Sequence, residues 1–202
     1  IILQKKIVKQ IIAANPVLFK RFLYLLEKKS ISDFSLPSIS YPIPSLITLL
    51  NVSKLYIAES LIEAVEGEWE AGTAKLLRLY QFTKRLSRSS RIMINKIASH
   101  ALMQFSLKAL TYIMNQTNCP EKIYPIILKS LPPLSEEELS VRVPIIFEFL
   151  SGVQLIDNLL KSNDTPFEEI GVISGIFPST SDWLNFLLKF KIFLNRNRTI
   201  GY

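Results

Sequence analysis

The sequence predicts an all-α protein of antiparallel helical hairpins, arranged as a solenoid-type bundle of about seven or eight helices. Apolar residues recur at helical spacing through most of the 202 residues. No Asn-Gly or Asp-Gly turn and no long alternating stretch indicates a strand. The links between the long helical stretches are short, which favours antiparallel neighbours.

Two helices are expected at the start of the chain. Ile2–Ala14 places apolar side chains on one side and lysines on the other. Asn15 and Pro16 then supply an N-cap and a first helical residue for a helix that ends near Lys29. The serines and prolines of 30–43 predict an extended connection. These features divide the chain into three parts: a helical pair at 1–29, a Ser/Pro linker at 30–43 and a helical-hairpin domain at 44–202.

The clearest hairpin consists of helices predicted at 44–66 and 68–86. Gly67 closes the first helix, because a helix commonly ends on a glycine that adopts the left-handed conformation. Gly72 is small enough to let the two helices approach closely, and Trp69 is expected to pack at the bend. We therefore assign structural roles to Gly67, Trp69 and Gly72.

Further helices are expected toward the end of the chain. Ser135 and Glu138 have the spacing of a capping box at the start of one of them, and Pro144 is expected to kink that same helix. The predicted bounds are approximate: Ser90–Asn115, Pro120–Leu131, Ser135–Ser162, and a last helix from Ser181 or Asp182 to Asn195.

The composition argues against catalysis and metal binding. The chain has one histidine, His100, and one cysteine, Cys119, which excludes an internal disulfide and the usual structural zinc sites. No glycine-rich phosphate-binding motif and no Gly-x-Ser-x-Gly motif occurs. We expect no catalytic residue, cofactor or metal, and we expect His100 and Cys119 to be packing residues in a protein that is not an enzyme.

No transmembrane helix is predicted. The longest stretch without charge, 34–53, contains three prolines and many serines, so its first half cannot continue a helix across a bilayer. Charged residues interrupt every other apolar run.

Glu148 interrupts the apolar run Val143–Leu150. A buried carboxylate is costly unless it is paired. Either Glu148 makes a buried polar contact that fixes the helix register or binds a ligand, or the helix is rotated so that Glu148 reaches water.

The positive charge is unevenly distributed. The chain carries a net charge of +7, and residues 71–120 contain eight lysines and arginines but no carboxylate. Arg85, Arg88 and Arg91 mark a junction between helices, where they are either a solvated helix end or a docking patch. An acidic protein or a lipid headgroup fits such a patch. Nucleic acid is not expected, because interleaved aromatic residues are missing.

The helix predicted at 183–194 is apolar nearly all round. It is either buried within this chain, covered by a partner subunit, or in contact with a membrane surface. We expect a partner to cover at least one of Phe186, Phe190 and Phe193. Because the chain stops soon afterwards without a polar tail, we also expect that more protein follows Tyr202 or that another subunit covers the helix.

The hairpin resembles one tetratricopeptide-type hairpin. Aromatic or small residues stand where that family has them, but Glu63 replaces a usual aromatic residue, and no second copy follows at the period of about 34 residues. The matching positions are Tyr56, Ser60, Gly67, Trp69 and Gly72.

A wider stretch, 44–202, is similar to a diffuse group of uncharacterised, secreted or envelope-associated bacterial helical proteins. The resemblance implies an export route and an envelope location. The segments that carry it are Pro44-Ser45-Leu46, Gly67-Glu68-Trp69, the amphipathic helix at 92–115, Leu131-Pro132-Pro133, the isolated Glu148 and Asn197-Arg198-Thr199.

These observations lead to one expected function and two alternatives. We expect a non-catalytic helical scaffold or assembly subunit that binds a protein partner or a second copy of itself, in a bacterial periplasm or envelope. The first alternative is a cytosolic adaptor with a basic docking surface, and the second is an enzyme of unrecognised class. Peripheral contact with a membrane is compatible with the expected function.

Overall fold

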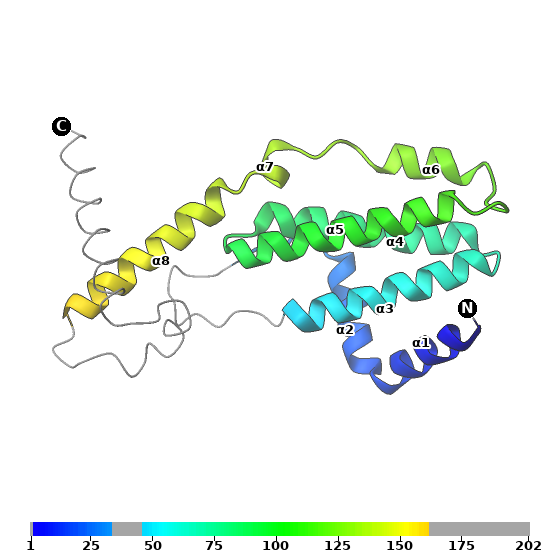
Figure 1. The fold of residues 1–202 in the computed structure, drawn as a ribbon, viewed down its shortest axis with the longest axis horizontal. Coiled ribbons are helices and arrows are strands. Elements are labelled where there is room, and N and C mark those ends of the chain that lie inside the picture. Colours follow the sequence, from blue (N-terminus) through cyan, green and yellow to red (C-terminus); the bar gives the residue numbers. More distant parts are fainter. Residues whose placement is uncertain (1, 34–45, 162–202) are drawn as a thin grey trace, which may run out of the picture. The chain divides into compact units, whose positions relative to one another are not determined.

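The computed structural model describes residues 2–33 and 46–161, and this part of the chain is all-helical, without a strand (Figure 1). The all-α fold class is confirmed, and helix packing makes a bundle. The linker from 34 onward and the helix predicted at 183–194, with Phe186, Phe190 and Phe193, lie outside the described residues. The helices are α1 (Ile2–Ala14), α2 (Pro16–Glu27), α3 (Leu46–Val65), α4 (Trp69–Ser89), α5 (Met93–Met114), α6 (Ile123–Ser130), α7 (Glu136–Leu139) and α8 (Arg142–Lys161).

The chain divides into two compact units, Ile1–Gln154 and Leu155–Tyr202. The first unit contains α1 to α7 and most of α8. In the second unit, the described residues are the end of α8.

Gly67 ends α3 as predicted. Its φ of 107° lies in the left-handed region, which favours glycine. The N–H of Glu68 donates to the carbonyl of Glu63 at 3.0 Å, and the N–H of Gly67 donates to the carbonyl of Ala64 at 3.0 Å. These two bonds are the Schellman pattern, which satisfies the last carbonyls of the helix and turns the chain into α4.

Gly72 lies where α4 crosses α3, as the sequence predicts. A Cβ atom at this position would lie 2.4 Å from the carbonyl oxygen of Ser60 and 2.9 Å from the Cβ of Ala64. Glycine is therefore the residue that lets the two helix backbones meet here. Trp69 is buried in the same core, against α3.

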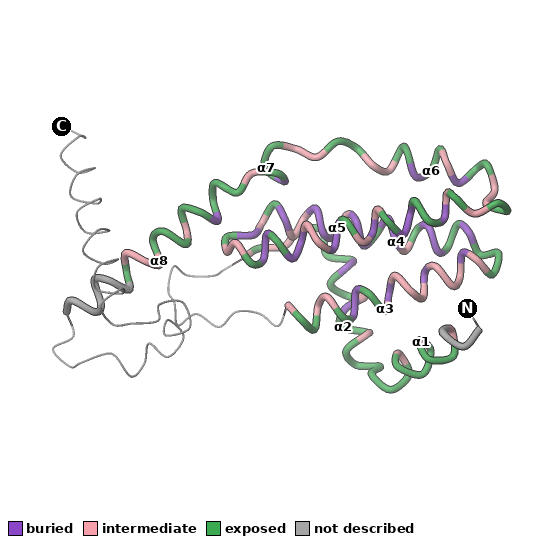
Figure 2. Tube along the Cα trace, viewed as in Figure 1, coloured by how far each residue is buried: buried purple, intermediate pink, exposed green. Residues whose placement is uncertain are grey.

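Helix α4 is the centre of the first unit. It packs against α3 and α5 along their lengths, and it also contacts α2, α6 and α7. Figure 2 shows the buried residues concentrated along α4 and the neighbouring faces of α3 and α5. Two apolar clusters result. One joins α3, α4, α5 and α6 around Leu76 and Leu110, and the other joins α2, α3 and α4 around Phe22 and Tyr56.

The predicted kink at Pro144 is wrong. The segment predicted as one helix from Ser135 forms two helices, α7 and α8, which are separated at Ser140 and Val141. Pro144 is the third residue of α8. Because N–H groups in the first turn have no partner within the helix, a proline is tolerated there without a kink.

Among the described residues, no helix is long and apolar enough to cross a membrane. The observation agrees with the sequence prediction for this part of the chain.

Candidate functional site

Glu138 is the centre of a buried polar cluster. The predicted capping box is present: the N–H of Glu138 donates to Ser135 Oγ at 3.3 Å, and the N–H of Ser135 donates to Glu138 Oε2 at 2.8 Å. Only 2% of Glu138 is exposed. The carboxylate therefore caps α7. Because it is buried, its negative charge also has to be neutralised by cations inside the protein.

Two cations of α4 pair with Glu138. Lys84 Nζ lies 3.3 Å from Oε2, and Arg88 Nη2 lies 3.0 Å from Oε1. Burial on its own would raise the pKa of Glu138. The hydrogen bonds from the Ser135 N–H and Lys84, with the charges of Lys84 and Arg88, outweigh burial and hold the pKa below its usual value.

Lys96 of α5 completes the cluster from the other side. It is 2% exposed, and its Nζ donates to the carbonyls of Ser87 at 2.9 Å and Glu137 at 3.0 Å. Burial lowers the pKa of Lys96, while the charge of Glu138 opposes that change. The lysine thus joins the C-terminal part of α4 to α7.

Ser87 and His100 lie side by side, but not as a nucleophile and its base. Ser87 Oγ is 3.0 Å from His100 Nε2, and both atoms contact the carbonyl of Glu138, at 2.8 and 2.9 Å. A carbonyl oxygen only accepts, so Nε2 carries a proton and donates it to that bond. Ser87 is fully buried. We therefore interpret the pair as part of a lock that holds α7 against α4 and α5. This lock consists of Lys84, Ser87, Arg88, Lys96, His100 and Glu138.

The three arginines proposed as a docking patch do not share one environment. Arg85 Nη2 donates to the carbonyl of Leu26 at 3.0 Å, and burial lowers the pKa of Arg85. Arg88 pairs with Glu138, and the backbone N–H of Arg91 donates to Asp33. Two of the three guanidinium groups therefore already have partners within the chain. A partner-binding role for the set stays a prediction.

Glu148 is exposed on α8 and accepts a hydrogen bond from the N–H of Met93 at 3.1 Å. Met93 is the first residue of α5, so a carboxylate lies at the positive end of that helix dipole. Glu148 therefore reaches water, as the second interpretation expects, and its hydrogen bond with Met93 is an exposed contact, not a buried one.

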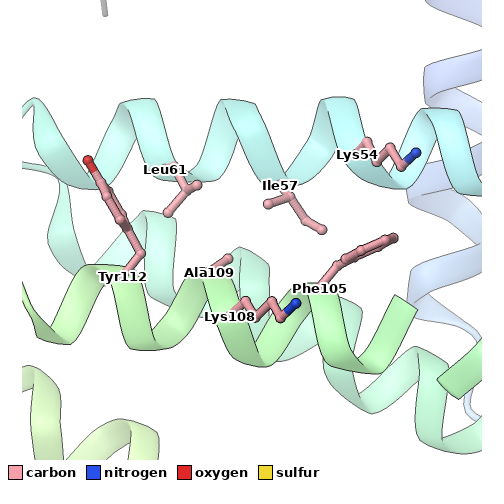
Figure 3. A pocket seen from close by; sticks show the side chains of 7 residues that line it. All are labelled: Lys54, Ile57, Leu61, Phe105, Lys108, Ala109 and Tyr112. Carbon is pink, nitrogen blue, oxygen red and sulfur yellow. The ribbon is translucent and has the colours of Figure 1, made fainter. Parts of the chain in front are cut away.

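A hollow of about 350 Å³ lies between α3 and α5, which run parallel on one side of α4 (Figure 3). We call it the α3–α5 groove. Ala109 forms its floor, while larger apolar side chains flank it on both walls. Tyr112 is 46% exposed at one end. The lining residues are Lys54, Ile57 and Leu61 of α3, and Phe105, Lys108, Ala109 and Tyr112 of α5.

The charges at the α3–α5 groove are all positive. Lys54 and Lys108 are its charged residues, one on each wall, and both are exposed. Lys54 Nζ lies 5.7 Å from the centre of the Phe105 ring. The nearby carboxylates of α3, Glu59 and Glu63, point to α4, where they pair with Lys75.

Neither the lock nor the groove is predicted by the sequence patterns described above. One signal for the lock is Lys96, which shares a helix face with Ser99 and Met103, residues that are buried. One signal for the groove is Ala109 between Phe105 and Tyr112, because a small residue between large ones on one helix face leaves a hollow.

No group of three or more histidine, cysteine, aspartate or glutamate side chains that could hold a metal ion occurs in the described ranges. No family model, no curated protein and no solved structure matches the chain.

Proposed function

We propose that the chain is a non-catalytic helical module that binds a partner protein, as a scaffold or assembly subunit. The observation that carries the proposal is the α3–α5 groove, a hollow between two packed helices whose apolar walls are half-buried and which is bordered by exposed Lys54, Lys108 and Tyr112. Grooves of this kind are a common docking site for one face of an amphipathic helix.

The walls of the groove are held in place from behind. Helix α3 meets α4 at Gly72, and α5 is joined to α4 and α7 by the buried lock. A hollow whose walls are already ordered costs little conformational entropy when a partner binds. This supports a binding role for the groove.

The tetratricopeptide-like character and the bacterial envelope location are part of the proposal and rest on the resemblances alone. The cytosolic adaptor is retained as the second candidate because Lys54 and Lys108 give the groove a basic rim. The two candidates differ in compartment, not in the surface that they use.

Photo-crosslinking in the cells from which the chain comes tests the proposal. A photoreactive phenylalanine analogue replaces Tyr112 in the groove, and the matched control replaces Tyr24, an exposed tyrosine of α2. We expect a discrete crosslinked protein from position 112 and none of the same size from position 24.

Competition then shows whether the groove itself is occupied. An excess of unlabelled wild-type chain should remove the crosslink, whereas the groove-wall variant, Phe105→Ala/Tyr112→Ala, should not. Crosslinks of equal yield from both positions, or equal competition by the groove-wall variant, would overturn the proposal.

A further inference from the structure

We infer that the segment bound in the α3–α5 groove is an acidic amphipathic helix, whose apolar stripe carries carboxylates along both edges. This inference rests on the proposed function and names the chemistry of the partner.

The shape of the groove fits a helix. The lining residues of α3 are spaced i, i+3 and i+7, and those of α5 are spaced i, i+3, i+4 and i+7. Each set covers two turns, or about 10 Å of helix. The ridge of a third helix packs between two parallel helices with this spacing. Ala109 leaves room at the middle for one large apolar side chain of the partner.

The charges decide which kind of helix fits. Lys54 and Lys108 stand on opposite walls, so an occupant meets a cation on each edge of its apolar stripe (Figure 3). Within the described part of the chain, neither lysine has an ion-pair partner, and no carboxylate lines the groove. Carboxylates on both edges of the stripe neutralise these charges, whereas basic edges would be repelled.

The chain's own apolar segment 183–194 lacks this complementarity. It carries Lys189 and Lys191 and no carboxylate. The groove is also an open hollow bordered by exposed Lys54, Lys108 and Tyr112, while an acyl chain needs a site that covers it on all sides. A helix from a partner protein is therefore the occupant that the geometry and charge favour.

A displayed library of helical peptides tests the inference without assuming its result. The peptides are about 14 residues long, roughly four turns, with leucines on one face and Glu, Lys or Gln at random along both edges. Selection on the wild-type chain should enrich Glu on both edges. The charge-reversal variant Lys54→Glu/Lys108→Glu should weaken binding of the selected peptides by about tenfold or more, and added salt should also weaken it.

The control variant Lys9→Glu/Lys20→Glu and the groove-wall variant distinguish a failure of this inference from a failure of the proposed function. Lys9→Glu/Lys20→Glu reverses two exposed lysines outside the groove and should leave binding unchanged. Selected peptides with Lys or Gln edges that fail on the groove-wall variant would overturn the acidic inference but keep the proposed function. Peptides indifferent to the groove-wall variant would overturn both. Binding to phosphatidylglycerol vesicles that depends on Lys54 and Lys108, without any selected peptide, would also overturn both and assign the groove to lipid headgroups.

Discussion

At the scale of single residues, the buried hydroxyl group of Tyr56 lowers the stability of the fold. It is 1% exposed, and its hydroxyl has no hydrogen-bond partner in the described part of the chain. Burial raises the pKa of Tyr56 to about 12. The charge of Arg78 lowers it, and those of Glu59 and Glu63 raise it further. The ring itself packs edge-on against Phe22 with centroids 5.6 Å apart. These aromatic contacts offset the free-energy cost of burying a hydroxyl group without a hydrogen-bond partner.

Replacement of Tyr56 by phenylalanine should not lower the free energy of unfolding. It keeps the ring contacts and removes a buried unsatisfied group, so a gain of up to about 1 kcal/mol is expected. Tyr124→Phe is the matched control. That hydroxyl donates to the carbonyl of Met114 at 2.7 Å, and its loss should cost about 0.5–1.5 kcal/mol. Urea denaturation measures both. An equal loss for the two variants would contradict the account of Tyr56.

At the scale of helices, turns and caps that depend on neighbouring residues were predictable from the sequence. Contacts between residues far apart in the sequence were not. Gly67 and the pair Ser135 and Glu138 act within a few residues of themselves, so the sequence pattern was sufficient to predict the turn and the cap. The buried lock joins α7 to α4 and α5, which lie far from α7 in the sequence, so no local pattern indicates which cations lie next to Glu138. The break before Pro144 was missed because a proline near a helix start and one inside a helix look alike until the start is known.

The crossing of α3 and α4 predicts an unusual response to alanine. Gly72→Ala adds a methyl group that collides with backbone atoms of Ser60, so it should lower the free energy of unfolding by about 1–3 kcal/mol. Helix propensity alone predicts a gain of about 1 kcal/mol. Gly152→Ala on α8 is the control, because its Cβ meets nothing within 4 Å and should cause no loss. Thermal melts compare the two. A stabilised Gly72→Ala variant would show that the helices do not meet there.

The lock of α7 predicts a pH dependence. The folded-state pKa of Glu138 lies below its unfolded value, so its stabilising effect is complete above the ordinary glutamate pKa of about 4.3 and is lost as the pH falls through the lower folded pKa. Glu138→Gln can keep the capping-box hydrogen bond but loses the charge. At neutral pH it should lower the free energy of unfolding by about 1.5–3 kcal/mol.

Denaturation at several pH values measures this effect. The difference between wild type and Glu138→Gln should shrink as the pH falls below about 4, because the unfolded wild-type chain then binds a proton at this carboxylate before the folded chain does. Glu137→Gln is the control, since that carboxylate is largely exposed although it also faces Arg88. A difference that stays constant with pH would contradict the assignment of Glu138 as the charged centre of the lock.

At the scale of the whole first unit, the lock and the α3–α5 groove, the proposed binding site, use different faces of α5. The side that faces α4 carries Lys96, His100 and the apolar core, which hold the helices in place. Another side, with Phe105, Lys108 and Tyr112, forms one wall of the groove. The sequence predicted this helix, which contains no acidic residue. It did not predict the groove, because a groove depends on which face of α3 lies next to α5.

The most direct test of the account is to map where a selected peptide binds. Methyl NMR of the full chain, titrated with that peptide, reports on Ile57, Leu61 and Ala109 in the groove and on Ile47 and Leu128 at exposed positions elsewhere. The account predicts shifts of the three groove methyl groups, no shifts at Ile47 and Leu128, and loss of the effect in the groove-wall variant. Shifts at Ile47 or Leu128 without shifts in the groove would contradict the claim that the α3–α5 groove is the binding site.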